Sequence, residues 1–336
     1  MPELGIVVGG DLQHLPELAS RAEDAGYESV WVAETARSAF VQATLVAQAT
    51  KRVAIGTAVA LAFPRSPAIT AMAARDLAEL SRGRFILGLG PQVKRVNEQR
   101  FSVPFEHPAP KMEEAVVAIR AVLAAFGGEP LDHRGRFYTL TMPPFPGASP
   151  APGPVPIYLA AVNIRMAEAA GRVADGICGH PMTSPQYVAE VLRPAVERGA
   201  NAAGRDPSEV SVTTNLITQV DHDGERARRE AALQVAFYAT TRTYAPVLAM
   251  HGFEDLQDPL RRAYVRGETA AMTEIALPMA GVLAAAGTPE EVGTRVDAFE
   301  GVADRVILGG VWVGTSPERA RESFELLLET FARRRD

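Results

Sequence analysis

The feature that most limits how this chain can fold is the regular alternation of short apolar runs with longer amphipathic segments. Eight apolar runs stand at residues 4–8, 29–33, 53–61, 84–90, 156–161, 174–179, 210–220 and 304–310. They lack strict polar alternation, which is typical of parallel strands that are buried on both faces. Right-handed crossovers leave few topologies for eight such units. The pattern predicts an α/β fold, a (β/α)8 barrel, with a doubly wound open sheet as the alternative.

The segments between the runs carry helix signals. A hydroxyl residue precedes a proline at Ser66, Ser184, Thr288 and Ser316, which is the usual start of a helix. In the helix predicted over 67–80, the spacing gathers one apolar face, made of Ile69, Met72, Ala73, Leu77 and Leu80.

Two interruptions break the strand–helix rhythm. Residues 127–155 predict a small excursion from the barrel after its fourth helix, ending in a linker rich in proline and glycine. Residues 225–287 predict an insertion of two or three helices between the seventh and eighth strands. We expect residues 1–336 to form a single domain, because barrels of this kind reach this length as one unit.

Composition narrows the classes of partner. The formal net charge of −6 gives no basic surface, so we expect no nucleic-acid partner. The apolar stretch 276–286 is too short to span a membrane, and the run at 4–8 is too short for a signal peptide. The single cysteine, Cys178, excludes a disulfide framework and indicates a reducing compartment such as the cytoplasm.

The segment GRFILGLGPQVKR, residues 83–95, raises the question of a dinucleotide-binding loop. That fingerprint requires a third glycine three positions after Gly90, where this chain has Val93, and Pro91 follows Gly90 directly. The segment therefore fails as a dinucleotide motif. We expect Gly88 and Gly90 instead to let a backbone pass close to a flat ligand.

In a (β/α)8 barrel the active site lies at the carboxyl ends of the strands. Among the residues predicted at these ends, Glu34 is the single carboxylate and His180 the single histidine. These ends offer no carboxylate pair for glycoside hydrolysis and no lysine for a Schiff base. They also lack residues at metal-ligand spacing, so we expect no metal. Cys178 is predicted to be buried and inert. A rim of glycines and small side chains favours a bound cofactor that brings its own chemistry.

Four segments of this chain have the order and spacing of segments found in a known protein family. They are AEDAGYESVWVAET (22–35), RVAIGTAVALAFPRSP (52–67), LAELSRGRFILGLGPQVKRVNEQRF (77–101) and PVPIYLAAVNIRMAEAAGRVADGIC (154–178). Together with the final DRVILGG they resemble the bacterial luciferase-like superfamily, and within it the deazaflavin-dependent oxidoreductases that use coenzyme F-420.

This resemblance implies where the cofactor would bind. A bulge with a non-proline cis peptide, at Ala58-Val59 after Thr57, would support the deazaflavin ring. The loop after the fourth strand would lie beside the ribityl phosphate, and the turn after the fifth strand would bind the phosphate, helped by the positive end of its helix. The cofactor-binding residues that we expect in these two loops are Gly90, Pro91, Gln92, Val162, Asn163, Ile164 and Arg165. Gly179 and His180 would close the other side of the phosphate.

The resemblance also shows departures. Where the family's sugar-phosphate dehydrogenases have Asp-His, this chain has Glu34-Thr35, which argues against glucose-6-phosphate as substrate. Glu34 and His180 are the candidate catalytic proton donors. For Glu34 the alternative is an ion pair with Arg37 or Arg65 that only fastens the rim, and for His180 it is a structural hydrogen bond.

The expected function is hydride transfer between coenzyme F-420 and an unidentified small organic substrate. One alternative is an FMN-dependent monooxygenase of the same superfamily, which differs in its oxygen chemistry. Another, of a different class, is a non-catalytic barrel that binds a flavin. The resemblance further implies a homodimer formed through helices of the early barrel.

Overall fold

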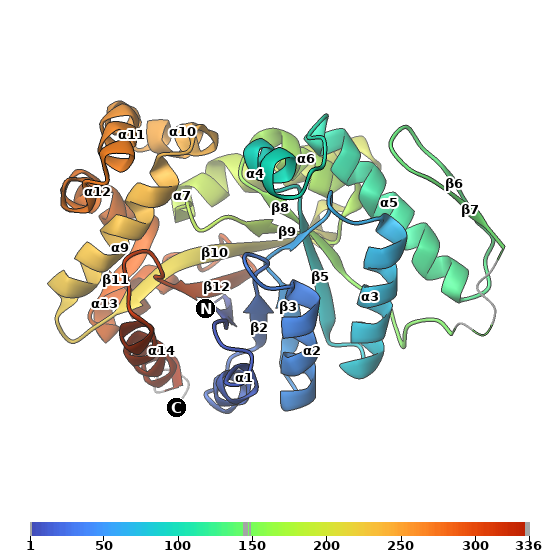
Figure 1. The fold of residues 1–336 in the computed structure, drawn as a ribbon, viewed down its shortest axis with the longest axis horizontal. Coiled ribbons are helices and arrows are strands. Elements are labelled where there is room, and N and C mark those ends of the chain that lie inside the picture. The colour runs from blue at the N-terminus through green and yellow to red at the C-terminus, as the bar shows by residue number, and fades with distance from the viewer. Residues whose placement is uncertain (1, 144–146, 148, 333–336) are drawn as a thin grey trace.

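The computed structural model describes residues 2–143, 147 and 149–332, and a closed ring of parallel strands stands at its centre (Figure 1). In sheet order the ring consists of β1 (Glu3–Val7), β2 (Ser29–Val32), β3 (Ala54–Thr57), β5 (Phe85–Gly90), β8 (Ile157–Ala161), β9 (Gly176–Gly179), β10 (Ser211–Val220) and β12 (Arg305–Gly310). β12 pairs in parallel with β1 and so closes the barrel. The predicted (β/α)8 barrel is confirmed, and each strand lies within the apolar run that predicted it, to within about one residue at the ends.

Two further short strands extend the sheet. β4 (Ala60–Leu61) continues the third strand and pairs with β5, while β11 (Ala284–Gly287) pairs with the carboxyl half of β10. The predicted excursion is a hairpin of β6 (Leu131–Arg134) and β7 (Thr139–Met142), and part of the linker that follows lies outside the described residues.

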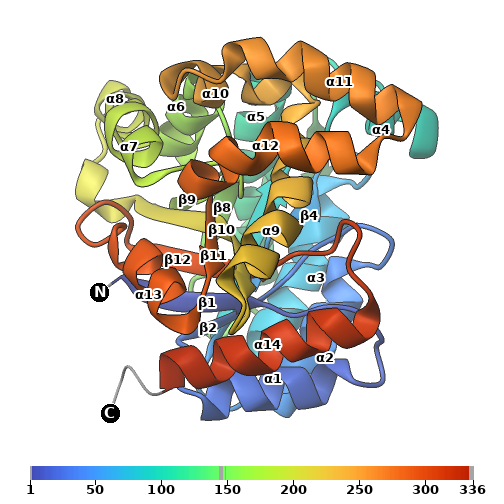
Figure 2. The ribbon, with the colours of Figure 1, turned by 90° about the vertical axis from the view of Figure 1, so that its left-hand side faces the viewer.

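Helices surround the ring (Figures 1 and 2). They are α1 (Leu15–Asp24), α2 (Ala39–Ala49), α3 (Pro67–Leu80), α4 (Lys94–Arg100), α5 (Pro108–Phe126), α6 (Ile164–Val173), α7 (Pro185–Tyr187), α8 (Arg193–Ala202), α9 (Gly224–Ala239), α10 (Ala245–Met250), α11 (Gln257–Arg266), α12 (Thr269–Leu283), α13 (Pro289–Asp297) and α14 (Pro317–Ala332). The four predicted starts are confirmed, since Ser66, Ser184, Thr288 and Ser316 each accept a hydrogen bond from a backbone N–H of the first turn. None of the described helices is long and apolar enough to cross a membrane.

The insertion predicted over residues 225–287 contains more helices than expected. It contains four α-helices, α9 to α12, and the strand β11, where the sequence predicted two or three helices. Figure 2 shows α10, α11 and α12 lying over the upper end of the barrel. The insertion therefore lies where it can contribute to a site at the strand ends.

The buried face of α3 differs from the prediction. Leu77 is buried as expected, but Ile69, Met72 and Leu80 are 56%, 44% and 42% exposed. The face that packs on the barrel is made of smaller residues, Thr70, Ala71, Ala74, Leu77 and Ala78. Small side chains let a helix approach a strand layer closely, so hydrophobicity alone pointed to the wrong face.

The barrel interior is filled around one aromatic side chain. Trp31 is fully buried and packs with Ile86, Tyr158, Cys178 and Ile307, which come from four other strands. A Cβ added at Gly56 would lie 2.1 Å from the Trp31 ring, and one at Gly5 would lie 2.7 Å from its indole nitrogen. The glycines of β1 and β3 thus make the space that the indole occupies, and the barrel is a packed core below its mouth.

Candidate functional site

The residues predicted to bind the cofactor lie on neighbouring strand ends. β3, β5, β8 and β9 are consecutive members of the ring, and each predicted segment follows or ends one of them. Neighbouring strands are about 4.8 Å apart, so the four ends cover about 14 Å of the rim. This contiguous stretch suits an elongated ligand with a ring at one end and a phosphate at the other.

The third strand ends in the predicted bulge. The peptide bond between Ala58 and Val59 is cis, which confirms its position. The buried Thr57 hydroxyl donates to the carbonyl of Gly88 at 2.7 Å, and Ala58 N–H donates to the carbonyl of Val32 at 2.8 Å. Ala58 and Val59 themselves are half-buried. The bulge is thus held from both neighbouring strands.

Gly88 and Gly90 make room for the β3 bulge, and their expected closeness to a ligand stays a prediction. A Cβ at Gly88 would lie 1.8 Å from the carbonyl oxygen of Thr57, and one at Gly90 would lie 2.5 Å from a Val59 methyl. Gly88 thus admits the backbone at the end of β3, and Gly90 admits the Val59 side chain of the bulge.

Glu34 is bound on every side. Arg65 donates to both carboxylate oxygens, at 2.6 Å from Nη1 and 2.5 Å from Nη2. The backbone N–H groups of Leu61 and Ala39 donate to the same carboxylate at 2.8 and 3.3 Å. The Glu34 side chain is only 7% exposed. These contacts are those of the rim-fastening interpretation, with Arg65 as the partner.

The loop after β5 is fixed by a residue that the sequence analysis missed. Asn97 is fully buried, and its side-chain amide donates to the carbonyls of Pro91 at 2.7 Å and Val93 at 3.2 Å. Gln92 adopts a left-handed backbone conformation with φ of 61° and caps the Val93 N–H with its own side chain. The carbonyls of this tight loop are therefore held from behind by α4.

The turn after β8 offers backbone donors. Asn163 precedes α6, and its carbonyl accepts from Met166 and Ala167. In the described part of the chain, the N–H groups of Ile164 and Arg165 have no protein acceptor. Free N–H groups at the start of a helix of ten residues form an environment that favours an anion. Arg165 is exposed at the same helix start.

Side chains from distant segments hold this turn. The Asn163 amide donates to the carbonyl of Thr243 at 3.1 Å, and the Tyr187 hydroxyl lies 3.1 Å from the carbonyl of Val162 and 3.3 Å from Asn163 Oδ1. Gly179 packs on Thr214, since a Cβ there would lie 2.8 Å from the Thr214 hydroxyl. Tyr187 and Thr243 were missed because each is far from this turn in sequence and carries no motif.

His180 lies beside the turn within an aromatic cluster. Its Nδ1 accepts from the backbone N–H of Met182 at 3.1 Å, and its Nε2 is 2.8 Å from the hydroxyl of Tyr244. The ring packs edge-on against Tyr238 at 4.8 Å. Burial disfavours the imidazolium and lowers the pKa of His180 to about 3, so the ring is neutral.

Open space remains on the far side of the mouth. A Cβ added at Gly9, Gly10 or Gly310 would meet no atom within 4 Å. Gly9 and Gly10 follow β1 and Gly310 ends β12, and these two strands lie across the ring from β5 and β8. All three glycines are exposed, so this part of the mouth is open to solvent.

The described residues support neither a reactive thiol nor a metal centre at the strand ends. Cys178 is buried as predicted, and burial raises the pKa of its thiol to about 12, so it stays protonated. Asn215 donates to Gly179 O at 2.8 Å and contacts the Cys178 sulfur at 3.3 Å. A search of the described residues finds no group of three histidine, cysteine or acidic side chains able to hold a metal ion.

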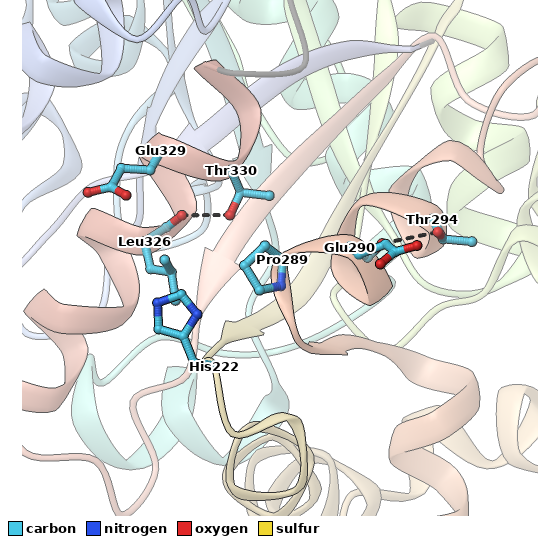
Figure 3. Close-up of a pocket in the computed structure, with 7 residues that line it drawn as sticks. All are labelled: His222, Pro289, Glu290, Thr294, Leu326, Glu329 and Thr330. Carbon is cyan, nitrogen blue, oxygen red and sulfur yellow. Dashed lines mark hydrogen bonds between the residues drawn. The ribbon is translucent and has the colours of Figure 1, made fainter.

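One surface cavity lies away from the mouth. It has a volume of about 250 Å³ and is lined by His222, Pro289, Glu290, Thr294, Leu326, Glu329 and Thr330 (Figure 3). Its two threonine hydroxyls donate to carbonyls of their own helices, at Leu326 and Glu290. None of the predicted site residues borders it, so we do not place the site there.

The chain matches the family model described as luciferase-like monooxygenase over residues 3–305. It therefore belongs to the luciferase-like family. This family consists of oxidoreductases and monooxygenases, which supports an enzyme at that level and confirms the resemblance seen in the sequence.

Relatives and solved structures place the chain within this family. It is 41% identical over 309 residues to an uncharacterized protein of Mycobacterium tuberculosis, covering 87% of this chain and 91% of that one. It is 32% identical to the 5,10-methylenetetrahydromethanopterin reductase of Methanolobus tindarius, covering 90% and 91%. The coenzyme F-420-dependent tetrahydromethanopterin reductase of Methanopyrus kandleri superposes with a TM-score of 0.83 at 22% identity, covering 98% of both chains. That likeness confirms the fold.

Proposed function

We propose that this luciferase-like barrel is a coenzyme F-420-dependent oxidoreductase that transfers hydride to or from a small organic substrate. The observation that carries the proposal is the rim itself, with a backbone bulge at one end, free helix N–H groups at the other and open glycines on the strand ends across the ring. When bound, the deazaflavin would supply the hydride chemistry at its ring.

The ring end of the site is built from backbone. Ala58 and Val59 would support the deazaflavin, since both are half-buried at the mouth and are fixed by Thr57 and Val32. A rigid support of this kind fixes the face of the ring that a substrate can reach, which is how placement contributes to rate. The empty positions beside Gly9, Gly10 and Gly310 leave room for the substrate.

The phosphate end of the site is built from donors. The N–H groups of Ile164 and Arg165 face no protein acceptor in the described chain, and the Arg165 guanidinium is exposed nearby. Pro91 and Gln92 would lie along the ribityl chain between the two ends, because β5 separates β3 from β8 in the ring. The 32% identity to a methylenetetrahydromethanopterin reductase, an enzyme whose Methanopyrus kandleri counterpart depends on coenzyme F-420, supports a deazaflavin over FMN.

The predicted proton donors divide into two roles in this proposal. Glu34 already accepts four hydrogen bonds, two of them from Arg65, so we infer that it holds the bulge and α2 together. His180 is neutral, with both nitrogens engaged, so we infer a role through Tyr244. Proton exchange at substrate would then involve water at the mouth.

The test is identification of the bound chromophore. The protein would be expressed in a host that makes both cofactors, purified without added flavin, and its extracted ligand identified by absorbance and mass. We expect coenzyme F-420 at close to one per chain. Recovery of FMN would indicate the monooxygenase alternative, and binding without any turnover across a panel of carbonyl and imine substrates would indicate a non-catalytic barrel.

We also propose that the enzyme is a cytoplasmic homodimer assembled through α2 and α3. These neighbouring helices expose Val41, Ile69, Met72 and Leu80, which are 42% to 56% exposed. Adjacent exposed apolar side chains are the usual core of such an interface. Light scattering on wild type and on a Ile69→Glu/Met72→Glu variant tests this, and we expect a dimer and a monomer respectively. Val265→Glu, on α11, is the exposed apolar control.

A further inference from the structure

Tyr244 is a buried tyrosine that the insertion brings to the strand ends. It ends the single turn η3 (Arg242–Tyr244) between α9 and α10, and the residue is 8% exposed. Its hydroxyl lies 2.8 Å from His180 Nε2. Burial raises the pKa of this hydroxyl well above its ordinary value, so it remains protonated.

The direction of the hydrogen bond between Tyr244 and His180 follows from the other ring nitrogen. His180 Nδ1 accepts from the Met182 N–H, so it carries no proton. A neutral ring must then carry its proton on Nε2, which donates to the Tyr244 oxygen. The Tyr244 proton consequently points away from His180, and the described residues offer it no acceptor.

Two contacts place this unused donor beside the turn after β8. Gly179, which precedes His180, pairs with Ala161, the last residue of β8. Asn163 donates to the carbonyl of Thr243, which precedes Tyr244. The start of α6 and Tyr244 are therefore linked from both sides, through neighbouring strand ends and through a side chain of the turn itself.

The region thus collects donors without an acceptor. In the described chain, no protein acceptor faces the N–H groups of Ile164 and Arg165 or the hydroxyl of Tyr244. The described ion pairs include none that brings a carboxylate to these residues. A group with several acceptor oxygens and negative charge satisfies such a set, whereas a neutral ligand oxygen satisfies only part of it.

We propose that the Tyr244 hydroxyl donates a hydrogen bond to the phosphate of the bound cofactor, with His180 as the residue that positions it. The proposal rests on the proposed function, since it requires a phosphate at the start of α6. It makes the insertion between β10 and β12 part of the cofactor site. His180 acts through its tautomer, because only an Nε2–H leaves the tyrosine proton free for the ligand.

The experiment compares two ligands that differ only in the phosphate. Tyr244→Phe is titrated by fluorescence with a deazaflavin mononucleotide and with the same deazaflavin lacking the phosphate. We expect a loss of about tenfold in affinity for the mononucleotide, the usual effect of one hydrogen bond to a charged group, and less than about twofold for the other ligand. Equal losses for both ligands, or no loss for either, would overturn the proposal.

Tyr238→Phe is the matched control. Tyr238 belongs to the same cluster, but its hydroxyl pairs with Gln234 and Trp312. We expect its affinities for both ligands to stay within about twofold of wild type. If wild type binds neither deazaflavin, the proposed function fails and takes this proposal with it; if wild type binds both equally, this proposal alone fails.

The positioning role of His180 is tested by a pair of variants. His180→Gln keeps an N–H within reach of the Tyr244 oxygen, and His180→Leu does not. We expect the first to retain mononucleotide affinity within about threefold and the second to lose about as much as Tyr244→Phe. In the double variant with Tyr244→Phe the losses should not add, because both act through one hydrogen bond. Fully additive losses would assign His180 a separate role.

Discussion

The two ends of the proposed cofactor site are built in different ways. At the β3 end, Gly88 packs on the backbone carbonyl of Thr57 and Gly90 packs on the Val59 side chain, and β3 and β5 are adjacent strands. At the β8–β9 end, side chains from η3 and α7 reach across to Asn163 and His180, with 64 to 80 residues between the partners Tyr244–His180 and Thr243–Asn163. One end is a rigid backbone shelf and the other is a side-chain network.

This difference predicts how each end responds to change. A backbone shelf has no room for an added atom, so substitutions there act on folding before they act on binding. A network of hydrogen bonds can lose one member and keep its fold, so substitutions there act first on ligand affinity. Stability and affinity should therefore separate along the rim.

The largest effect is expected at Gly88. A Cβ there would lie 1.8 Å from the Thr57 carbonyl oxygen, which belongs to the backbone and cannot rotate away. We expect Gly88→Ala to lower the free energy of unfolding by about 3 kcal/mol or more, as severe overpacking does. Urea unfolding followed by circular dichroism measures this.

Gly310→Ala is the control for Gly88→Ala. Its Cβ would meet no atom within 4 Å, so the free energy of unfolding should change by less than about 0.5 kcal/mol. If both alanine variants unfold at wild-type urea concentrations, the β3 end is more adaptable than the shelf description allows.

The second effect concerns Glu34. Its side chain is 7% exposed and forms a bidentate ion pair with Arg65. Breaking a buried ion pair costs about 3 kcal/mol. We expect Glu34→Gln to lower the free energy of unfolding by up to that amount while turnover stays within about tenfold. A fall in turnover of about a hundredfold with unchanged stability would restore Glu34 as the proton donor.

More of the β3 end than of the β8–β9 end could be predicted from the sequence. The barrel and the caps at Ser66 and Thr288 could be predicted from patterns of nearby residues, and the Ala58–Val59 cis peptide was implied by the family resemblance. The face of α3 was misassigned, since alanines and a threonine pack on the barrel where larger apolar residues were expected. Tyr244 could not be predicted, because its role depends on how a long insertion folds back over the mouth.

The third effect is a pH dependence from His180. Its pKa is about 3 in the folded protein and 6.5 as the ordinary value, so below pH 6.5 the unfolded chain takes up a proton that the native one does not. The stability that depends on neutral His180 is fully present above pH 6.5 and is lost as the pH falls toward 3, because only the unfolded chain gains the proton. Between pH 7 and pH 5 the free energy of unfolding falls by about 2 kcal/mol for this reason.

Comparison with His180→Asn isolates the contribution of His180 to this pH dependence. Other titrating groups, including His251, whose pKa is also lowered by burial, contribute to both proteins alike. Urea unfolding at pH 7 and pH 5 should show the wild type losing more stability than the variant on acidification. Parallel losses would mean that the native protein does not lower the pKa of His180, so that the hydrogen bond from Met182 to Nδ1 does not keep the ring neutral.

The smallest effect is expected at Tyr187, which fastens the turn after β8 from behind. Its hydroxyl lies 3.1 Å from the Val162 carbonyl and 3.3 Å from Asn163 Oδ1, and the residue is buried. One neutral hydrogen bond contributes about 1 kcal/mol, so Tyr187→Phe should lower the free energy of unfolding by about that much. If the turn is held in its ligand-ready form by this contact, affinity for the deazaflavin mononucleotide should fall several-fold, because the ligand must then order the turn. Calorimetric titration beside urea unfolding separates the two quantities. A stability loss with unchanged affinity would show that the turn keeps its shape without Tyr187, and Asn163–Thr243 would then be the contact that organises the network end.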